Sequence, residues 1–190
     1  FKDAMAFFQQ HGPQRHQVER QMRLRPADPW PRSNGHVVLA TPGSRDTEKA
    51  YHEPGGSFSP TAGSFGVSIW VADQAGHAIV TSDQLSLDQI RQQFAWNEGS
   101  EIPGIVTDTP YYQTHWSLDT HGRWTLGLTP SGRDHRLMIV LRSVGPAGGP
   151  IRSIEWDNRR LLLNERWSVT VQPAPVLVSI GEEGAQIWMT

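Results

Sequence analysis

The chain has 190 residues, a formal net charge of −2 and no cysteine. This length suits one large domain, with or without an extension, that buries its core without covalent cross-links. The composition excludes disulfides, thiolate metal sites and cysteine nucleophiles, and the slight negative charge argues against nucleic-acid binding. No apolar run is long enough to cross a membrane. The lack of cysteine suits a reducing cytoplasm and is also compatible with an exported protein.

The two ends of the chain are unusual for a complete protein. It begins FKDAMAFF, without an initiator methionine, and it ends GAQIWMT, inside an apolar strand-like run. Natural termini usually trail into polar residues. We interpret the chain as a piece of a longer protein; the alternative is an ordinary protein whose first residues were trimmed.

Residues 1–25 are predicted to be a helical N-terminal extension. Phe1, Met5 and Phe8 recur at spacings of four and three, as one helix face requires. After a Gly-Pro break, Val18 and Met22 continue the pattern in an arginine-rich segment. Those arginines are typical of a solvated helix face, and a phosphate-binding patch is the alternative.

Residues 26–190 are predicted to form a β-sandwich domain. Its first part, 26–63, is rich in Pro, Gly and Ser and reads as long loops around one short strand at 36–40. Strands follow from Ser64, with Trp70 on the opposite face from its apolar neighbours. The run 86–96 (SLDQIRQQFAW) predicts one later helix, because Ser86 and Gln89 have capping-box spacing. A strand is the alternative there, since strands lie on both sides.

The remainder is predicted to be almost wholly β. The run 111–118 and the strand after it flank a turn at 120–122, and 136–142 (RLMIVLR) is apolar on both faces, as a central covered strand would be. Further short runs separated by turns continue to the end of the chain. The predicted fold class is therefore mainly β, an antiparallel β-sandwich (supersandwich-like) with a short helical N-terminal segment.

Motifs of high specificity for catalysis or cofactors are missing from the sequence. It contains no GxGxxG, P-loop, GxSxG or HExxH pattern, so we assign no cofactor and no catalytic residue. His115, Asp119 and His121 could meet at a metal only if the strand ran straight through. Because Asp-Thr-His-Gly is a turn signal, Asp119 is interpreted as bonding turn amides, and no metal site is predicted.

Acidic residues in loop-like sequence leave a hydrolytic function open. Glu53, Glu98, Glu101 and Asp108 could supply the two carboxylates that glycosidic hydrolysis uses. We interpret them as solvated loop acids. A small β-fold glycosidase remains an alternative hypothesis.

The aromatic residues give the candidate ligand site. Of the eight tryptophans, Trp116, Trp124 and Trp167 lie on the apolar phase of their strands, which predicts core positions. A second set could stack on and hydrogen-bond to a sugar, because sugars have apolar C–H faces and polar rims. These ligand-binding candidates are Tyr111, Gln113, His115 and Trp96. The alternative is that they border a half-buried sheet face.

Three stretches carry a resemblance to a known family: PGGSFSPTAGSFGVSIWV, THWSLDTHGRWTLGLT and IRSIEWDNRRLLLNERWSVTVQP. Across 36–190 the pattern resembles the N-terminal β-sandwich domain of bacterial glycoside hydrolases whose catalytic domain is an (α/α)6 barrel. The resemblance implies a non-catalytic domain that packs on a C-terminal catalytic domain and contacts carbohydrate. The family's catalytic carboxylates belong to the barrel, so none is assigned here. A stand-alone binding or scaffold protein of unknown ligand is the alternative.

Overall fold

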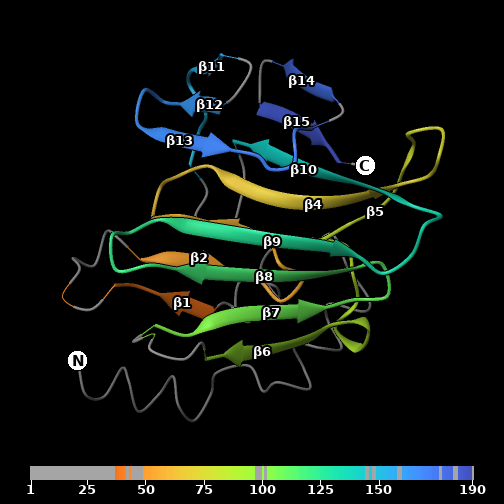
Figure 1. The fold of residues 1–190 in the computed structure, drawn as a ribbon, viewed down its shortest axis with the longest axis horizontal. Coiled ribbons are helices and arrows are strands. Elements are labelled where there is room, and N and C mark those ends of the chain that lie inside the picture. The colour runs from red at the N-terminus through yellow and green to blue at the C-terminus, as the bar shows by residue number, and fades with distance from the viewer. Residues whose placement is uncertain are drawn as a thin grey trace, which may run out of the picture.

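A computed structural model describes residues 37–41, 43, 49–96, 100, 102–143, 146, 149–157, 160–175, 177–181 and 184–189. The helical extension expected at 1–25 lies outside these residues. The described chain is mainly β-strand and forms three antiparallel sheets (Figure 1). This confirms the predicted mainly-β, antiparallel sandwich-like fold. In the described part, no helix is long and apolar enough to span a membrane.

The largest sheet has eight strands in the order β1-β2-β3-β4-β10-β15-β14, with β5 pairing on β4. Its central strand β10 pairs with β4 over seven residues and with β15 on its other side. Both faces of β10 are largely buried, as the doubly apolar run predicts. The strand bounds are β1 Val37–Leu39, β2 Ala50–His52, β3 Phe58–Ser59, β4 Gly66–Ala72, β5 Ala78–Thr81, β10 Arg136–Arg142, β14 Leu177–Gly181 and β15 Gly184–Trp188.

Two smaller sheets share one core with the large sheet. The four-stranded sheet contains β6 (Arg91–Ala95), β7 (Gly104–Asp108), β8 (Tyr112–Leu118) and β9 (Trp124–Pro130), and the three-stranded sheet contains β11 (Ile154–Trp156), β12 (Arg160–Leu163) and β13 (Trp167–Thr170). All three sheets contribute buried side chains to the main cluster, among them Phe58, Val67, Ile105, Trp116, Leu141, Leu161 and Leu163. The three sheets therefore bury their inner faces in a single cluster of side chains.

The helix predicted at 86–96 is wrong. Only Leu87–Gln89 form a short 3-10 turn, η2, and the chain then continues as strand β6. The expected contact at the start of the turn does form, since the Ser86 amide donates to Gln89 Oε1 at 3.4 Å. Pairing of five β6 residues with β7 outweighs the local helical spacing, because tertiary pairing routinely overrides propensity.

Within the described residues, the stretch expected as loops around one strand also contains β2 and β3 in addition to β1. The segment between and after these strands, 54–61, is buried although its composition is that of a loop. Its carbonyl groups accept hydrogen bonds from the four-stranded sheet. Tyr112 Oη donates to the Gly55 carbonyl at 2.8 Å, and Trp116 Nε1 donates to the Gly56 carbonyl at 3.1 Å. Side chains distant in sequence therefore satisfy the main chain of this segment.

Candidate functional site

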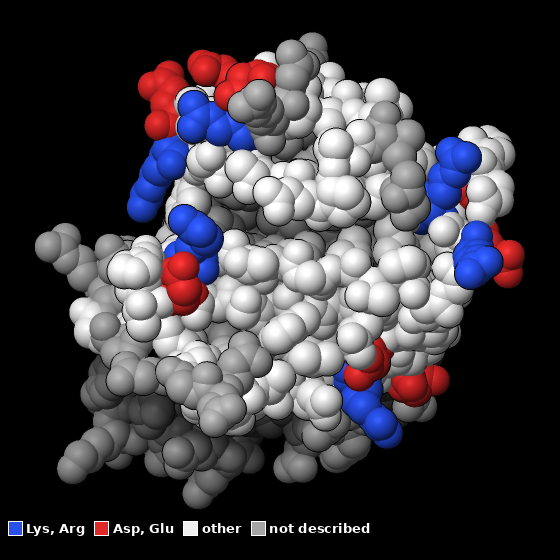
Figure 2. Space-filling view, in the orientation of Figure 1, with Lys and Arg blue, Asp and Glu red and all other residues white. Residues whose placement is uncertain are grey.

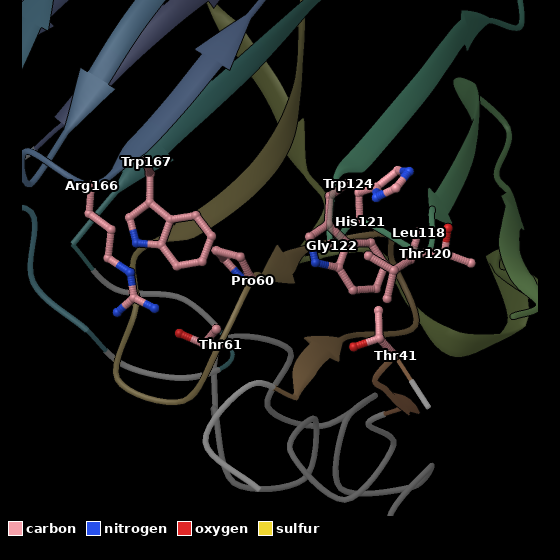
Figure 3. A pocket seen from close by; sticks show the side chains of 10 residues that line it. All are labelled: Thr41, Pro60, Thr61, Leu118, Thr120, His121, Gly122, Trp124, Arg166 and Trp167. Atoms are coloured by element: carbon pink, nitrogen blue, oxygen red, sulfur yellow. The ribbon is translucent and has the colours of Figure 1, made fainter. Parts of the chain in front are cut away.

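A cavity of about 350 Å³ lies where the β8–β9 turn, the start of β13 and the segment after β3 meet (Figure 3). This volume is near the lower end of the roughly 300–1,000 Å³ that is usual for small-ligand sites. The cavity is lined by Thr41, Pro60, Thr61, Leu118, Thr120, His121, Gly122, Trp124, Arg166 and Trp167. It therefore draws on all three sheets.

Two tryptophans form the apolar walls of this cavity. Trp124 opens β9 and Trp167 opens β13, and Figure 3 shows them on either side of Pro60. Each is half-buried and packs partly on the core: the Trp124 ring lies 4.9 Å from the Phe58 ring, and the Trp167 ring lies edge-on to Phe65 at 6.1 Å. The predicted core role is thus correct for part of each indole, and the remaining surface faces the cavity.

The β8–β9 turn supplies part of the polar rim, through Thr120 and His121. Asp119 Oδ1 accepts hydrogen bonds from the amides of His121 and Arg123, each at 2.9 Å, and Gly122 adopts a left-handed φ of 79° that few side chains tolerate. These amide bonds, chiefly the one from Arg123, lower the pKa of Asp119 below its ordinary value. The interpretation of Asp119 as a turn residue is confirmed. Among the described residues, no group of three His, Asp or Glu side chains is placed to hold a metal.

Arg166 is the cation of the cavity. Its guanidinium carbon lies 5.0 Å from the centre of the Trp167 ring, in a cation–π contact. No acidic side chain in the described part of the chain forms an ion pair with it. The described residues of the lining include Arg166 and His121 as ionisable side chains and no carboxylate. This part of the lining is therefore neutral to positive in charge.

The structure does not bring the four predicted ligand residues together. Tyr111 precedes β8, and its ring meets His135 edge-on at 5.4 Å. Trp96 follows β6 and is 67% exposed. Since Phe94 pairs with Ile105 and Ile105 with Trp116, Trp96 lies at the other end of the sheet from Tyr111. In this register Trp96 is level with Leu118, seven residues along the sheet from Tyr111, which is roughly 23 Å.

Gln113 and His115 do share one face, the outer face of β8. Gln113 Nε2 donates to Asp108 Oδ1 at 2.6 Å, and the His115 ring lies against Gly104, where an added Cβ would come within 2.6 Å of its Nε2. Figure 2 shows charged side chains around the rim of this view and few over its middle. Ligand contact by these two residues stays a prediction.

Two of the loop acids, Glu53 and Asp108, belong to the described residues. The groups of theirs that hydrogen bonds locate lie on opposite sides of the four-stranded sheet. Gln92 Nε2 donates to the Glu53 carbonyl at 3.0 Å on the core side, whereas Asp108 lies on the outer side with Gln113. Glu98 and Glu101 lie outside the described residues. The sheet thus separates the Glu53 main chain from the Asp108 carboxylate.

Sequence reasoning did not find the cavity, because its walls come from segments far apart in the chain. The only local signal is the adjacency of Arg166 and Trp167, and nothing in it points to Thr41 or Pro60. Comparison with protein-family models, with curated proteins and with solved structures found no match.

Proposed function

We propose that this chain is a non-catalytic β-sandwich domain of a glycoside hydrolase and that the cavity between Trp124 and Trp167 contacts carbohydrate. The observation that carries the proposal is the pairing of two indole surfaces with a rim of hydroxyl groups from Thr41, Thr61 and Thr120. Indoles pack against the apolar C–H faces of a sugar, and hydroxyls exchange hydrogen bonds with its rim.

Binding, rather than hydrolysis, fits the chemistry of this cavity. Cleavage of a glycosidic bond ordinarily uses two carboxyl groups on opposite sides of the scissile bond. The lining residues that the structure describes include neither aspartate nor glutamate. The site would therefore hold or orient a glycan while a catalytic domain acts on it, as the family resemblance implies.

The test is a binding panel of soluble tetrasaccharides, namely cello-, malto-, xylo- and chitotetraose together with tetragalacturonate, measured by calorimetry. We expect Trp167→Leu to weaken binding at least about fivefold, because one stacking surface is removed. His121→Ala, at an exposed position, is a second cavity variant that does not disturb the core. Trp96→Ala is the matched control, since that indole is exposed and outside the cavity.

Each pattern of results decides the proposal. Loss of affinity in the cavity variants, with Trp96→Ala unchanged, supports it. Loss in Trp96→Ala alone would move the site to the end of β6. No binding to any glycan of the panel would refute the carbohydrate role and favour a stand-alone binding or scaffold protein with another ligand.

A catalytic domain in the same longer chain is the proposed protein partner. Phe94, on the edge strand β6, and Trp96, just after this strand, are 55% and 67% exposed, and such aromatic surface at a sheet edge suits contact with another domain. The cysteine-free composition supports a cytoplasmic location. An immunoblot of source cells is the test: a band far above 21.3 kDa supports the partner, and a band at 21.3 kDa contradicts it.

A further inference from the structure

We propose that the sugar bound in the cavity carries a carboxylate, as a uronic acid residue does, and that Arg166 binds this group. The inference rests on the proposed carbohydrate role and deepens it. Its first support is the charge of the cavity: among the lining residues that the structure describes, Arg166 is the one permanent cation, His121 is the other ionisable group, and there is no aspartate or glutamate. A carboxylate on the ligand would balance the positive charge of the guanidinium.

The second support is the way Arg166 is held. With the guanidinium 5.0 Å from the Trp167 ring centre, the indole restricts the side chain, so less conformational entropy is lost when a ligand binds. A guanidinium offers paired N–H donors that match the two oxygens of a carboxylate. In Figure 3 it lies at the same end of the cavity as Thr61, whose hydroxyl could serve the neighbouring ring oxygen or hydroxyl of the sugar.

The third support concerns two acidic residues close to the cavity in sequence, Asp119 and Glu165, neither of which lines it. The Asp119 carboxylate accepts amide hydrogen bonds inside its own turn. Glu165, although next to Arg166 in sequence, lines a separate cavity together with Arg152 and Asn164. A single guanidinium also matches the single negative charge of a carboxylate better than the nearly double charge of a phosphate monoester.

The test compares tetragalacturonate with its fully methyl-esterified form, which keeps the same linkage but loses the charge. We expect the free acid to bind about tenfold more tightly at low salt, because hydrogen bonds to a charged group are the stronger ones, and the preference to shrink at high salt. Arg166→Gln should abolish the preference, because only the free acid loses a charged partner, and the readout is the ratio of the acid and ester affinities in this variant. Arg133→Gln is the matched control, because it removes the same charge from an exposed turn at the other end of β9.

The outcomes separate this inference from the function on which it rests. Equal binding of acid and ester overturns the carboxylate assignment and leaves the carbohydrate role standing. Tighter binding of galactose 6-phosphate than of galacturonate overturns it in favour of a phosphorylated sugar. A preference that survives in Arg166→Gln, or disappears in Arg133→Gln, also overturns it. Failure of every glycan to bind removes both proposals.

Discussion

Replacing Tyr112 by Phe tests whether side chains of the four-stranded sheet stabilise the buried segment 54–61. The Tyr112 side chain is fully buried, and its hydroxyl donates to the Gly55 carbonyl at 2.8 Å. Without that hydroxyl the carbonyl loses this donor in a place that water does not reach. Leaving a buried acceptor unpaired costs about 1–3 kcal/mol, so we expect the free energy of unfolding to fall by that amount. For a chain of this size the melting temperature should fall by roughly 2–10 °C.

The assay is urea unfolding followed by tryptophan fluorescence, with Tyr111→Phe as the matched control. Tyr111 is half-exposed and precedes β8, so the same chemical change there should alter the free energy of unfolding by less than about 0.5 kcal/mol. The slope of unfolding against urea should stay the same in both variants. If Tyr112→Phe and Tyr111→Phe behaved alike, the account of how 54–61 is stabilised would be refuted.

Three further changes probe other parts of the fold. Gly55→Ala should destabilise by about 3 kcal/mol or more, because the new Cβ would lie 2.1 Å from the Ser82 carbonyl oxygen and main chain would have to shift. Asp83→Ala should lower the free energy of unfolding by about 2 kcal/mol, because the Arg142 guanidinium loses its ion-pair partner. Urea unfolding measures the effect of Gly55→Ala and of Asp83→Ala. Because the pKa of Asp119 is lowered in the folded chain, the stability that its carboxylate contributes is present above about pH 4 and is lost as the pH falls through the folded-state pKa. The melting temperature should therefore drop between about pH 5 and pH 2, and it should drop less steeply in Asp119→Asn.

Each of these changes has a control that the structure supplies. Gly122→Ala meets nothing within 4 Å and should cost only the backbone strain of a positive φ, about 1 kcal/mol. Arg160→Ala breaks an ion pair with Asp157 that is more than half exposed and keeps the Arg160 amide bond to Asp157 Oδ1, so it should cost less than about 0.5 kcal/mol. For the dependence on pH, Asp119→Asn itself is the comparison with the unaltered chain. If a control had as large an effect on stability as the change with which it is paired, the structural argument for that change would be contradicted.

Sequence patterns predicted those parts of the fold that depend on local chemistry. The doubly apolar run of β10 marked a central strand, and Asp119 to Gly122 marked the β8–β9 turn, because both signals reside in adjacent residues. The burial of 54–61 was not predictable, since its hydrogen-bond donors Tyr112 and Trp116 come from another sheet. Strand β6 was mistaken for a helix because Leu87, Ile90 and Phe94 have helical spacing, whereas pairing with β7, which local sequence does not reveal, decides the structure.

The cavity was out of reach for a related reason. The alternation of apolar residues along their strands predicts that Trp124 and Trp167 face the core, and the structure places both on that face. Each is, however, the first residue of its strand, where the core ends. Whether an indole at a strand end is covered depends on the neighbouring sheet. The predicted surface of Tyr111 and Trp96 failed to assemble because strand pairing places them at opposite ends of one sheet.

The most direct test of the carbohydrate role is a titration of the indole N–H signals of the uniformly ¹⁵N-labelled chain, assigned by single tryptophan substitutions. The chain has eight tryptophans, so each signal reports on one place in the fold. During titration with the tightest-binding tetrasaccharide of the panel, we predict that the signals of Trp124 and Trp167 shift and saturate together, while those of Trp96 and Trp188 stay in place. Shifts confined to Trp96, or no shift with any glycan of the panel, would contradict the assignment of the cavity as a sugar site.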